Sequence, residues 1–330
     1  MFTFERITYP LIYPLQIGIN KSPLTKREII KIYYNQLEIS ELSPLPGLHP
    51  ESLDESFRIL KKFVENKTID DFFNEVFLNN KKNLLDTNKS IILQNSTKLF
   101  FGLFKNDLEI DLPNSVIFAI ELGLINSVFT QRPENQPYCA LDFQSNKILI
   151  ESCCPSIKIK IGRNSLIEEN KKLKKYINET NFLLRLDGNK KLSAIDLITI
   201  MDQIPEDRIE YIEDPFINQK ELVEFYQQTK SIIPLAYDEG LINNMGHPNF
   251  FSNFPKQVKF AIIKPNLIGG ISASNKIAQE LEKCQIKVVL SSSFEGPIGI
   301  LGIQKMQSIF SHYDLPAGID TLKFFQTEFI

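Results

Sequence analysis

Three acidic residues recur at nearly equal intervals in the second half of the chain, each at the end of a short apolar segment: Asp187, Glu213 and Asp238. Glu213 follows Asp187 by 26 positions and Asp238 follows Glu213 by 25, about one strand-helix unit of a parallel barrel. One such residue alone is more typical of a helix cap or a turn. Three in register predict carboxylates that lie side by side at one mouth of a barrel.

Converging carboxylates repel one another unless a cation neutralises them, and ligands that are all oxygen favour Mg²⁺ or Mn²⁺ over zinc. We therefore predict that the three carboxylates bind Mg²⁺, with Mn²⁺ as the alternative. The four cysteines and three histidines show no zinc-ligand spacing. We expect the cysteines to be buried, reduced thiols.

Two lysines flank the carboxylates by the same spacing. Lys160 precedes Asp187 by 27 positions, and Lys264 follows Asp238 by 26. In the segment 157–161 the lysines alternate with isoleucines, so Lys158 and Lys160 share one face. That segment alone is more typical of a solvated edge strand, but the neighbouring strands favour lysines that point into a barrel.

Lysines on opposite sides of a metal suit the removal of a proton next to a carboxylate. Such a proton is weakly acidic, so the metal and nearby cations must stabilise the enolate. A lysine base must be neutral near pH 7, and we expect Lys158 and the metal to lower the pKa of Lys160 from about 10.4.

The elements that position these residues repeat one theme from about Pro137 onward: an apolar strand, a polar turn and an amphipathic helix. Capping-box patterns at 193–196 and 218–221 mark two helix starts. With a last extended stretch at 314–320, this alternation predicts a closed α/β barrel, a modified (β/α)7β TIM-type barrel, over an open sheet. The predicted strands are 138–142, 156–161, 182–187, 208–213, 233–238, 258–264 and 286–291.

Residues 1–98 follow a different pattern, with alternating strands near 2–6 and 29–34 and helices in 51–66 and 68–79. We predict an N-terminal α+β capping domain in 1–98, with a contribution from the C-terminal tail, and the barrel in 99–330. A helix in 111–129 leads into the barrel. A length of 330 residues suits one large and one smaller domain.

The composition excludes some classes of partner. The net charge of -3 comes from 37 basic and 40 acidic residues interspersed along the chain, without the basic surplus that nucleic acid requires. The N-terminus resembles neither a signal peptide nor a membrane span, so we expect a cytoplasmic protein. The sequence leaves the oligomeric state open.

Several motifs resemble the o-succinylbenzoate synthase family of the enolase superfamily, in its muconate cycloisomerase-like subgroup, whose members use a Lys or His base with magnesium. The similar segments are 158–160, 184–189, 212–215, 238–239 and 263–266. The segment 43–47 resembles that family's loop over the active site, and 291–295 resembles its serine-rich seventh strand. The similarity covers most of the chain and ends at 318–322. Gly188, Asp214 and the pair Gly296-Pro297 depart from residues that are common in the family.

The resemblance implies a lyase that dehydrates 2-succinyl-6-hydroxy-2,4-cyclohexadiene-1-carboxylate to o-succinylbenzoate in menaquinone biosynthesis. Lys160 would be the base that then protonates the departing hydroxide, and Lys264 would stabilise the enolate from the other face. The serines would hold the succinyl carboxylate. The implied substrate-binding residues are Lys158, Arg185, Asn189, Ser291, Ser292 and Ser293.

Two other functions remain open. An N-succinylamino acid racemase or dipeptide epimerase of the same superfamily would use the same two lysines. A catalytically inert barrel that serves as a binding module would not need them. The sequence also leaves open whether a loop near 20–27 orders only when substrate binds.

Overall fold

The computed structural model describes residues 1–17, 22–66, 69–75, 112–133, 136–142, 154–202, 204–229, 231–238, 241 and 254–326. Seven parallel strands form one sheet in the order β10-β9-β8-β7-β6-β5-β4. All seven were predicted, to within one or two residues at each end. They are β4 (Cys139–Leu141), β5 (Ser156–Lys160), β6 (Leu183–Asp187), β7 (Ile209–Glu213), β8 (Leu235–Tyr237), β9 (Val258–Ile263) and β10 (Lys287–Leu290).

The sheet curls until its two edge strands share one segment. The Cys139 N–H of β4 donates to the Ala317 carbonyl at 2.8 Å, and the Gly318 N–H donates to the Leu290 carbonyl of β10 at 2.8 Å. The stretch predicted at 314–320 therefore bridges the first and last strands, and the predicted closed barrel is confirmed.

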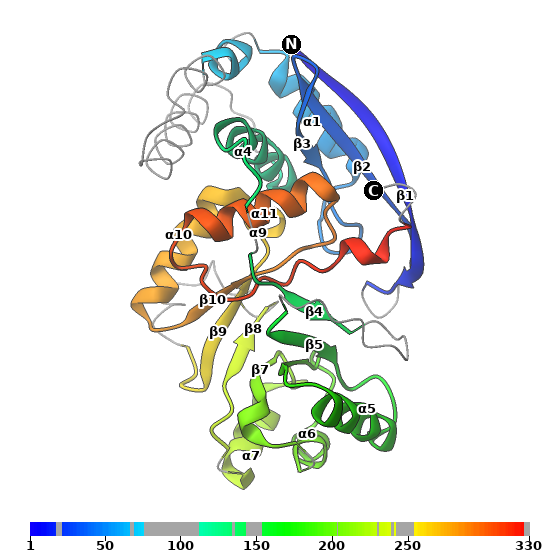
Figure 1. Cartoon of the computed structure of the whole chain (residues 1–330), viewed down its shortest axis with the longest axis vertical. Helices are drawn as coiled ribbons and strands as arrows, with labels where there is room; N and C mark the ends of the chain where they lie inside the picture. Colours follow the sequence, from blue (N-terminus) through cyan, green and yellow to red (C-terminus); the bar gives the residue numbers. More distant parts are fainter. Residues whose placement is uncertain are drawn as a thin grey trace.

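Helices surround this barrel and pack on the outward-facing side chains of the strands (Figure 1). Ser193 caps α6 and Ser165 caps α5, both in capping boxes. At α7 the Asn218 side chain accepts the Glu221 N–H at 3.2 Å, but the Glu221 carboxylate accepts the Ala194 N–H at 2.7 Å instead of closing a capping box. The helices are α5 (Leu166–Glu179), α6 (Ala194–Met201), α7 (Gln219–Thr229), α9 (Pro265–Ile268), α10 (Gly270–Lys283) and α11 (Pro297–Ile309), with a 3-10 turn η1 (Glu206–Arg208).

An antiparallel sheet, in the order β1-β2-β3, covers one end of the molecule. Its strands are β1 (Phe2–Leu15), β2 (Leu24–Tyr34) and β3 (Leu37–Leu42), and β3 was not predicted. Helix α1 (Leu53–Val64) begins with a capping box at Ser52. Helix α4 (Asn114–Val128) is buried almost all round because Val116 packs with the N-terminal sheet and Leu122 packs with the barrel helices. Figure 1 shows α4 and α11 between the small sheet and the barrel.

The C-terminal segment returns to the N-terminal sheet. After η3 (Leu322–Phe324), Phe325 pairs with Leu11 of β1, and its ring stacks on Tyr9 with centroids 5.3 Å apart. The predicted domain boundary between 98 and 99 lies outside the described residues, as does the end of the predicted helix at 68–79, whose described part, 69–75, is helical.

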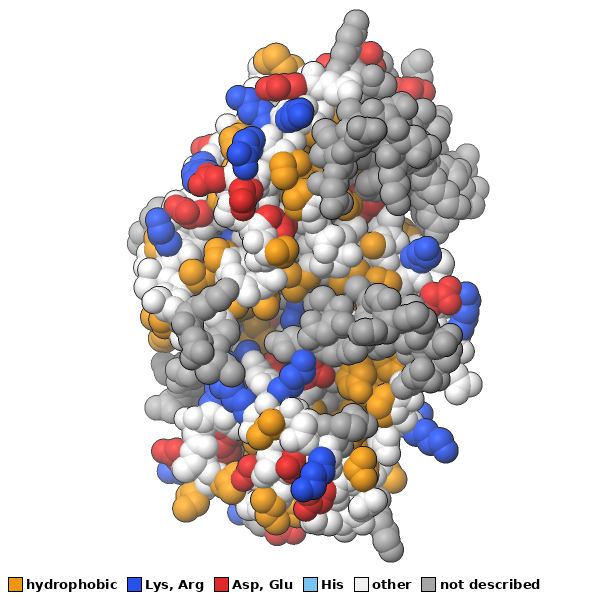
Figure 2. Space-filling model, turned by 180° about the vertical axis from the view of Figure 1, so that it is seen from behind, with side chains coloured by type: hydrophobic (Ala, Val, Ile, Leu, Met, Phe, Trp, Pro, Cys, Tyr) orange, Lys and Arg blue, Asp and Glu red, His pale blue; other side chains and the backbone are white. Residues whose placement is uncertain are grey.

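The face of the molecule in Figure 2 has no dominant charge. Acidic and basic side chains lie next to one another over the face in Figure 2. Within the described ranges, no helix is long and apolar enough to cross a membrane. Cys139 and Cys154 are buried thiols, but Cys284 is exposed, so the prediction of buried cysteines was wrong there; Cys153 lies outside the described residues. Cys284 is exposed because it ends α10 at a surface turn.

Candidate functional site

A cavity of about 380 Å³ lies at the carboxyl ends of the barrel strands, within the size range of small-molecule sites. The N-terminal part of the chain supplies one side of it through the end of β1 and the loop after β3, including Tyr13, Leu45 and Leu48. The barrel supplies the polar side. Its polar lining residues are Asp142, Lys158, Lys160, Arg163, Asp187, Asn189, Glu213, Asp214, Asp238, Lys264, Ser291, Ser292, Ser293 and Thr321.

The three predicted ligand carboxylates all line this cavity. Asp187 and Glu213 are paired neighbours in the register of β6 and β7, and Asp238 directly follows β8. Their residues are only 5%, 2% and 7% exposed, respectively, so their charges are removed from bulk water. Such burial is costly unless cations face the carboxylates.

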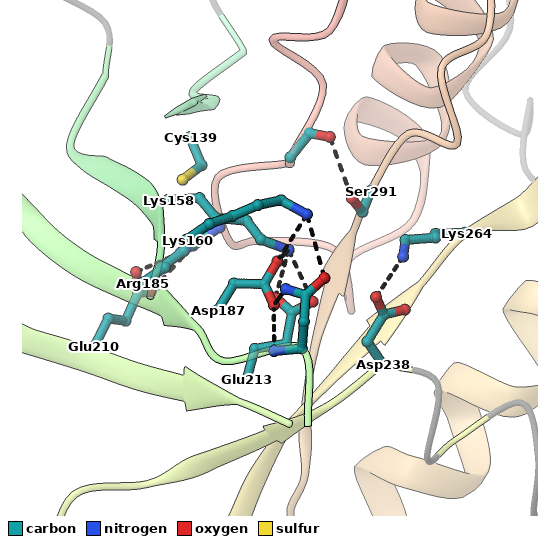
Figure 3. Close-up of polar contacts among 12 residues, drawn as sticks. Cys139, Lys158, Lys160, Arg185, Asp187, Glu210, Glu213, Asp238, Lys264 and Ser291 are labelled. Atoms are coloured by element: carbon teal, nitrogen blue, oxygen red, sulfur yellow. Dashed lines mark hydrogen bonds and ion pairs between the residues drawn. The ribbon is translucent and has the colours of Figure 1, made fainter. Parts of the chain in front are cut away.

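Lysine side chains supply these cations (Figure 3). Lys158 Nζ lies 2.7 Å from Glu213 Oε2 and 3.0 Å from Asp187 Oδ2, so it bridges two carboxylates. Lys264 forms an ion pair with Asp238. Lys160 Nζ is 3.7 Å from Asp187 Oδ2 and is the more loosely held of these ammonium groups.

Figure 3 shows Lys160 and Lys264 approaching the carboxylates from opposite sides. Burial lowers the pKa of Lys160, Asp187 opposes that change, and the charges of Lys158 and Arg163 add to it. Burial also acts to lower the pKa of Lys264, but Asp238 outweighs it and raises the pKa. The two lysines therefore differ in charge environment, with Lys264 fixed in an ion pair and Lys160 much less so.

The carboxylates also differ in how burial and neighbouring charges affect their pKa values. Burial opposes ionisation of Asp187, but Lys158 and Lys160 lower its pKa to about 2. Burial is the largest influence on Glu213 and raises its pKa, against the charge of Lys158. The Lys158 ammonium contacts both Glu213 oxygens, at 2.7 and 2.8 Å, and these contacts favour the ionised carboxylate.

The donor atoms fit a hard divalent cation. All are carboxylate oxygens, and Asp238 Oδ1 is buried without a hydrogen-bond partner among the described residues. In the part of the chain that the structure describes, no three Asp, Glu, His or Cys side chains are already gathered as a metal cluster. The reason is local, because the Lys158 ammonium lies between Asp187 and Glu213 and neutralises them.

Backbone packing explains why Gly188 replaces the alanine that is common in the family. A Cβ on Gly188 would lie 2.5 Å from Pro215 Cα, too close for any side chain. The Gly188 N–H donates to the Glu213 carbonyl at 3.0 Å, so β6 and β7 stay in contact beyond both ligands. Gly188 therefore sets the spacing between Asp187 and Glu213.

The predicted serines line the cavity, but each of their three hydroxyl hydrogens is already donated to another group of the chain. Ser291 donates to the Gly318 carbonyl at 3.3 Å. Ser292 Oγ donates to Glu295 Oε2 at 2.6 Å, and the Ser293 hydroxyl donates to Glu295 Oε1. Glu295 is fully buried and holds this segment in place.

The structure brings Asn189 to the site but not Arg185. Asn189 lines the cavity and accepts a hydrogen bond from Lys160 Nζ at 3.4 Å. Arg185 is not a lining residue; it donates to Glu210 at 2.6 and 3.1 Å and to the Pro316 carbonyl at 2.7 Å. Since its donors are occupied inside the barrel, Arg185 has no access to a substrate in this structure.

Sequence reasoning missed the residues that hold the loop at 43–49 over the cavity. The buried Arg27 guanidinium donates to the Pro44 carbonyl at 2.9 Å and to the Ser43 carbonyl. His49 accepts the Leu45 N–H through Nδ1 at 2.8 Å and meets the Asn266 carbonyl through Nε2 at 3.1 Å. Arg27 lies 17 positions before Pro44 and His49 lies 217 positions before Asn266, so no local pattern indicated these contacts. Residues 20 and 21 of the predicted loop near 20–27 lie outside the described residues.

Comparison with known proteins gives one family match. Residues 144–316 match the model of the family described as enolase C-terminal domain-like. The chain is 28% identical over 150 residues to o-succinylbenzoate synthase from Pectobacterium atrosepticum and 29% identical over 142 residues to that from Haemophilus influenzae. The aligned stretches cover 44% and 42% of this chain and 44% and 41% of the relatives, so the chain spans less than half the length of the relatives it matches.

Solved structures with the same fold cover nearly the whole chain. MenC from Desulfotalea psychrophila has a TM-score of 0.68 at 15% identity, covering 99% of this chain and 95% of that one. The L-Ala-D/L-Glu epimerase from Bacillus subtilis has a TM-score of 0.65 at 16% identity, with coverage of 99% and 91%. The o-succinylbenzoate synthase from Thermosynechococcus elongatus, complexed with Mg, has a TM-score of 0.60 at 16% identity, with coverage of 100% and 95%.

Proposed function

The chain belongs to the enolase C-terminal domain-like family, and from this premise we propose that it is a magnesium-dependent o-succinylbenzoate synthase. The observation that carries the proposal is the asymmetric pair of lysines. Lys160 and Lys264 lie on opposite sides of three buried carboxylates, and the first is loosely held while the second is fixed in an ion pair.

Lys160 and Lys264 have different roles in the proposed dehydration. Lys160 takes the proton from the carbon next to the ring carboxylate and then delivers it to the hydroxyl on the neighbouring carbon, which leaves as water with its bonding electrons. The ring thereby gains the double bond that makes it aromatic. Lys264 faces the developing negative charge from the other side.

Asp187, Glu213 and Asp238 are the residues that would hold Mg²⁺. When bound, the ion supplies positive charge beside the substrate carboxylate. The buried Oδ1 of Asp238, which has no hydrogen-bond partner in the described part of the chain, supports this assignment, as does the all-oxygen donor set. Asn189 accepts a hydrogen bond from Lys160 and so orients its ammonium group.

The choice of substrate is supported by the relatives named o-succinylbenzoate synthase over less than half of the chain. A second candidate is an N-succinylamino acid racemase or dipeptide epimerase. It is favoured by the two-sided placement of the lysines and by the likeness to an epimerase at a TM-score of 0.65. A racemase would use each lysine as a base on its own face, whereas dehydration needs only one.

The two candidates separate in one experiment. Purified protein with Mg²⁺ is given the cyclohexadiene carboxylate, and in parallel an N-succinylamino acid and an L-Ala-L-Glu dipeptide, and initial rates are compared. We expect rapid formation of the aromatic product and slower or no racemisation. Efficient racemisation without aromatic product would overturn the choice of substrate. Failure to turn over any of the three, with no effect of Mg²⁺ on thermal unfolding, would instead support an inert binding module.

A further inference from the structure

One cation that lines the cavity, Arg163, has no role in the mechanism described above. Lys158 and Lys264 are in ion pairs with the carboxylates, and Lys160 lies near Asp187. Arg163 also lines the cavity, yet among the described residues its guanidinium has no ion-pair partner and donates no hydrogen bond. Its charge is close enough to Lys160 to affect that ammonium group.

The backbone beneath Arg163 is fixed by a buried carboxylate. Glu169 of α5 is 3% exposed, and its Oε1 accepts the Arg163 N–H at 2.9 Å and the Asn164 N–H at 3.0 Å. Gly162, just before, has a φ of 75°, which favours glycine and turns the chain sharply after β5. The guanidinium therefore extends from a rigid turn only three positions after Lys160.

The serines that line the cavity are weaker donors for an anion. Each serine hydroxyl has one hydrogen, and those of Ser292 and Ser293 are donated to Glu295. Ser291 retains the longer bond to the Gly318 carbonyl at 3.3 Å. To bind a carboxylate, Ser292 or Ser293 would have to leave Glu295 with a buried, unsatisfied oxygen, which is unfavourable.

We propose that Arg163 binds the second carboxylate of a dicarboxylate substrate at the mouth of the cavity. This inference rests on the proposed function, in which the substrate has one carboxylate on the ring and one on the succinyl chain. In this proposal the ring carboxylate lies near Lys160 and the metal ligands, and the succinyl carboxylate lies at Arg163, which lines the same cavity. A guanidinium binds a carboxylate through two parallel N–H groups, and because Arg163 is exposed, pairing requires little loss of its hydration.

The test uses two ligands that differ in the second carboxylate only. Isothermal titration in Mg²⁺ measures the Kd of o-succinylbenzoate and of 2-butanoylbenzoate, which keeps the ring carboxylate and ends in a methyl group. Arg163→Gln is compared with wild type and with the control Lys171→Gln. Lys171 is an exposed cation on the nearby helix α5, and it does not line the cavity. We expect Arg163→Gln to raise the Kd of o-succinylbenzoate about tenfold, equivalent to ~1.4 kcal/mol, and to leave the other Kd unchanged.

The outcomes distinguish this inference from the proposed function. If wild type forms the aromatic product but Arg163→Gln binds o-succinylbenzoate as tightly as wild type, Arg163 is not the contact and the function stands. Equal weakening of both ligands also overturns the inference, because it indicates a general effect on the site. If wild type neither forms product nor prefers the dicarboxylate, both are overturned. A matching loss of affinity in Lys171→Gln would show non-specific charge attraction and would contradict the proposal.

Discussion

Replacing Gly188 with alanine introduces the residue that is common in the family, yet we expect it to disturb the site and to destabilise the protein. The added Cβ would lie 2.5 Å from Pro215 Cα, whereas ordinary contact begins at 3.4 Å, so the two backbones must separate by about 0.9 Å. Overpacking of this kind costs ~1–3 kcal/mol. Because the separation falls between Asp187 and Glu213, and a displacement of about 1 Å near the chemistry costs on the order of 100-fold, we expect a loss of turnover of that order.

For each variant, kcat at saturating Mg²⁺ and the midpoint of thermal unfolding are measured and compared with wild type. Gly123→Ala is the matched control, because its Cβ would meet the tip of the Ile39 side chain at 3.2 Å and its backbone is helical, where alanine is favoured by up to about 1 kcal/mol. We expect the control to keep wild-type kcat. If Gly188→Ala also keeps wild-type kcat and stability, contact between β6 and β7 does not position the ligands and the reasoning is refuted.

Three further predictions follow from the site and its supports. Glu213→Gln should abolish the stabilisation of the folded state by Mg²⁺, which for wild type reaches ~2.7 kcal/mol at a Mg²⁺ concentration about 100 times the Kd. The exposed control Glu179→Gln should keep this stabilisation. If Mg²⁺ stabilises Glu213→Gln as much as wild type, Glu213 is not a ligand. Burial raises the pKa of Glu41 to about 7, so the folded state holds a proton that the unfolded state releases, and stability should fall as pH rises from about 4.5 through 7. Glu41→Gln should remove that pH dependence. If the free energy of unfolding changes equally in both proteins between about pH 5 and pH 8, the prediction is contradicted. Asn266→Ala removes the hydrogen bond that the Asn266 side-chain amide donates to the Ser43 carbonyl of the covering loop at 2.9 Å, and it should raise KM several-fold with kcat nearly unchanged. A change in kcat alone would show that the loop does not close the cavity.

The chemistry-bearing residues were predictable because parallel strands convert regular spacing into proximity. Asp187 and Glu213, 26 positions apart, are register partners, and Lys158 and Lys160 share the cavity face because strands alternate. The three isoleucines that alternate with those lysines in 157–161 are buried against the outer helices, as the pattern predicted. Such inferences need only local periodicity and the order of strands.

Other parts of the site depend on partners that no local pattern reveals. The Arg27 guanidinium donates to the Phe294 carbonyl across 267 positions, and β3 was missed because its polar Ser40 and Glu41 are buried by contacts from α4 and α11. Arg185 was expected at the substrate from its position in a motif. That position gives no information about Glu210, to which the Arg185 guanidinium donates. Long-range polar pairing therefore limits what the sequence can predict.

Turnover by Lys160→Ala tests the central claim most directly, because Lys160 is the residue proposed to move the proton. The variant and the exposed control Lys171→Ala are assayed with the cyclohexadiene carboxylate and Mg²⁺, and folding is verified by circular dichroism. General acid-base groups contribute about 10²–10⁴-fold, so we expect Lys160→Ala to lose at least that factor while it remains folded and stabilised by Mg²⁺, and Lys171→Ala to match wild type. A folded Lys160→Ala that forms aromatic product at the wild-type rate would contradict the account.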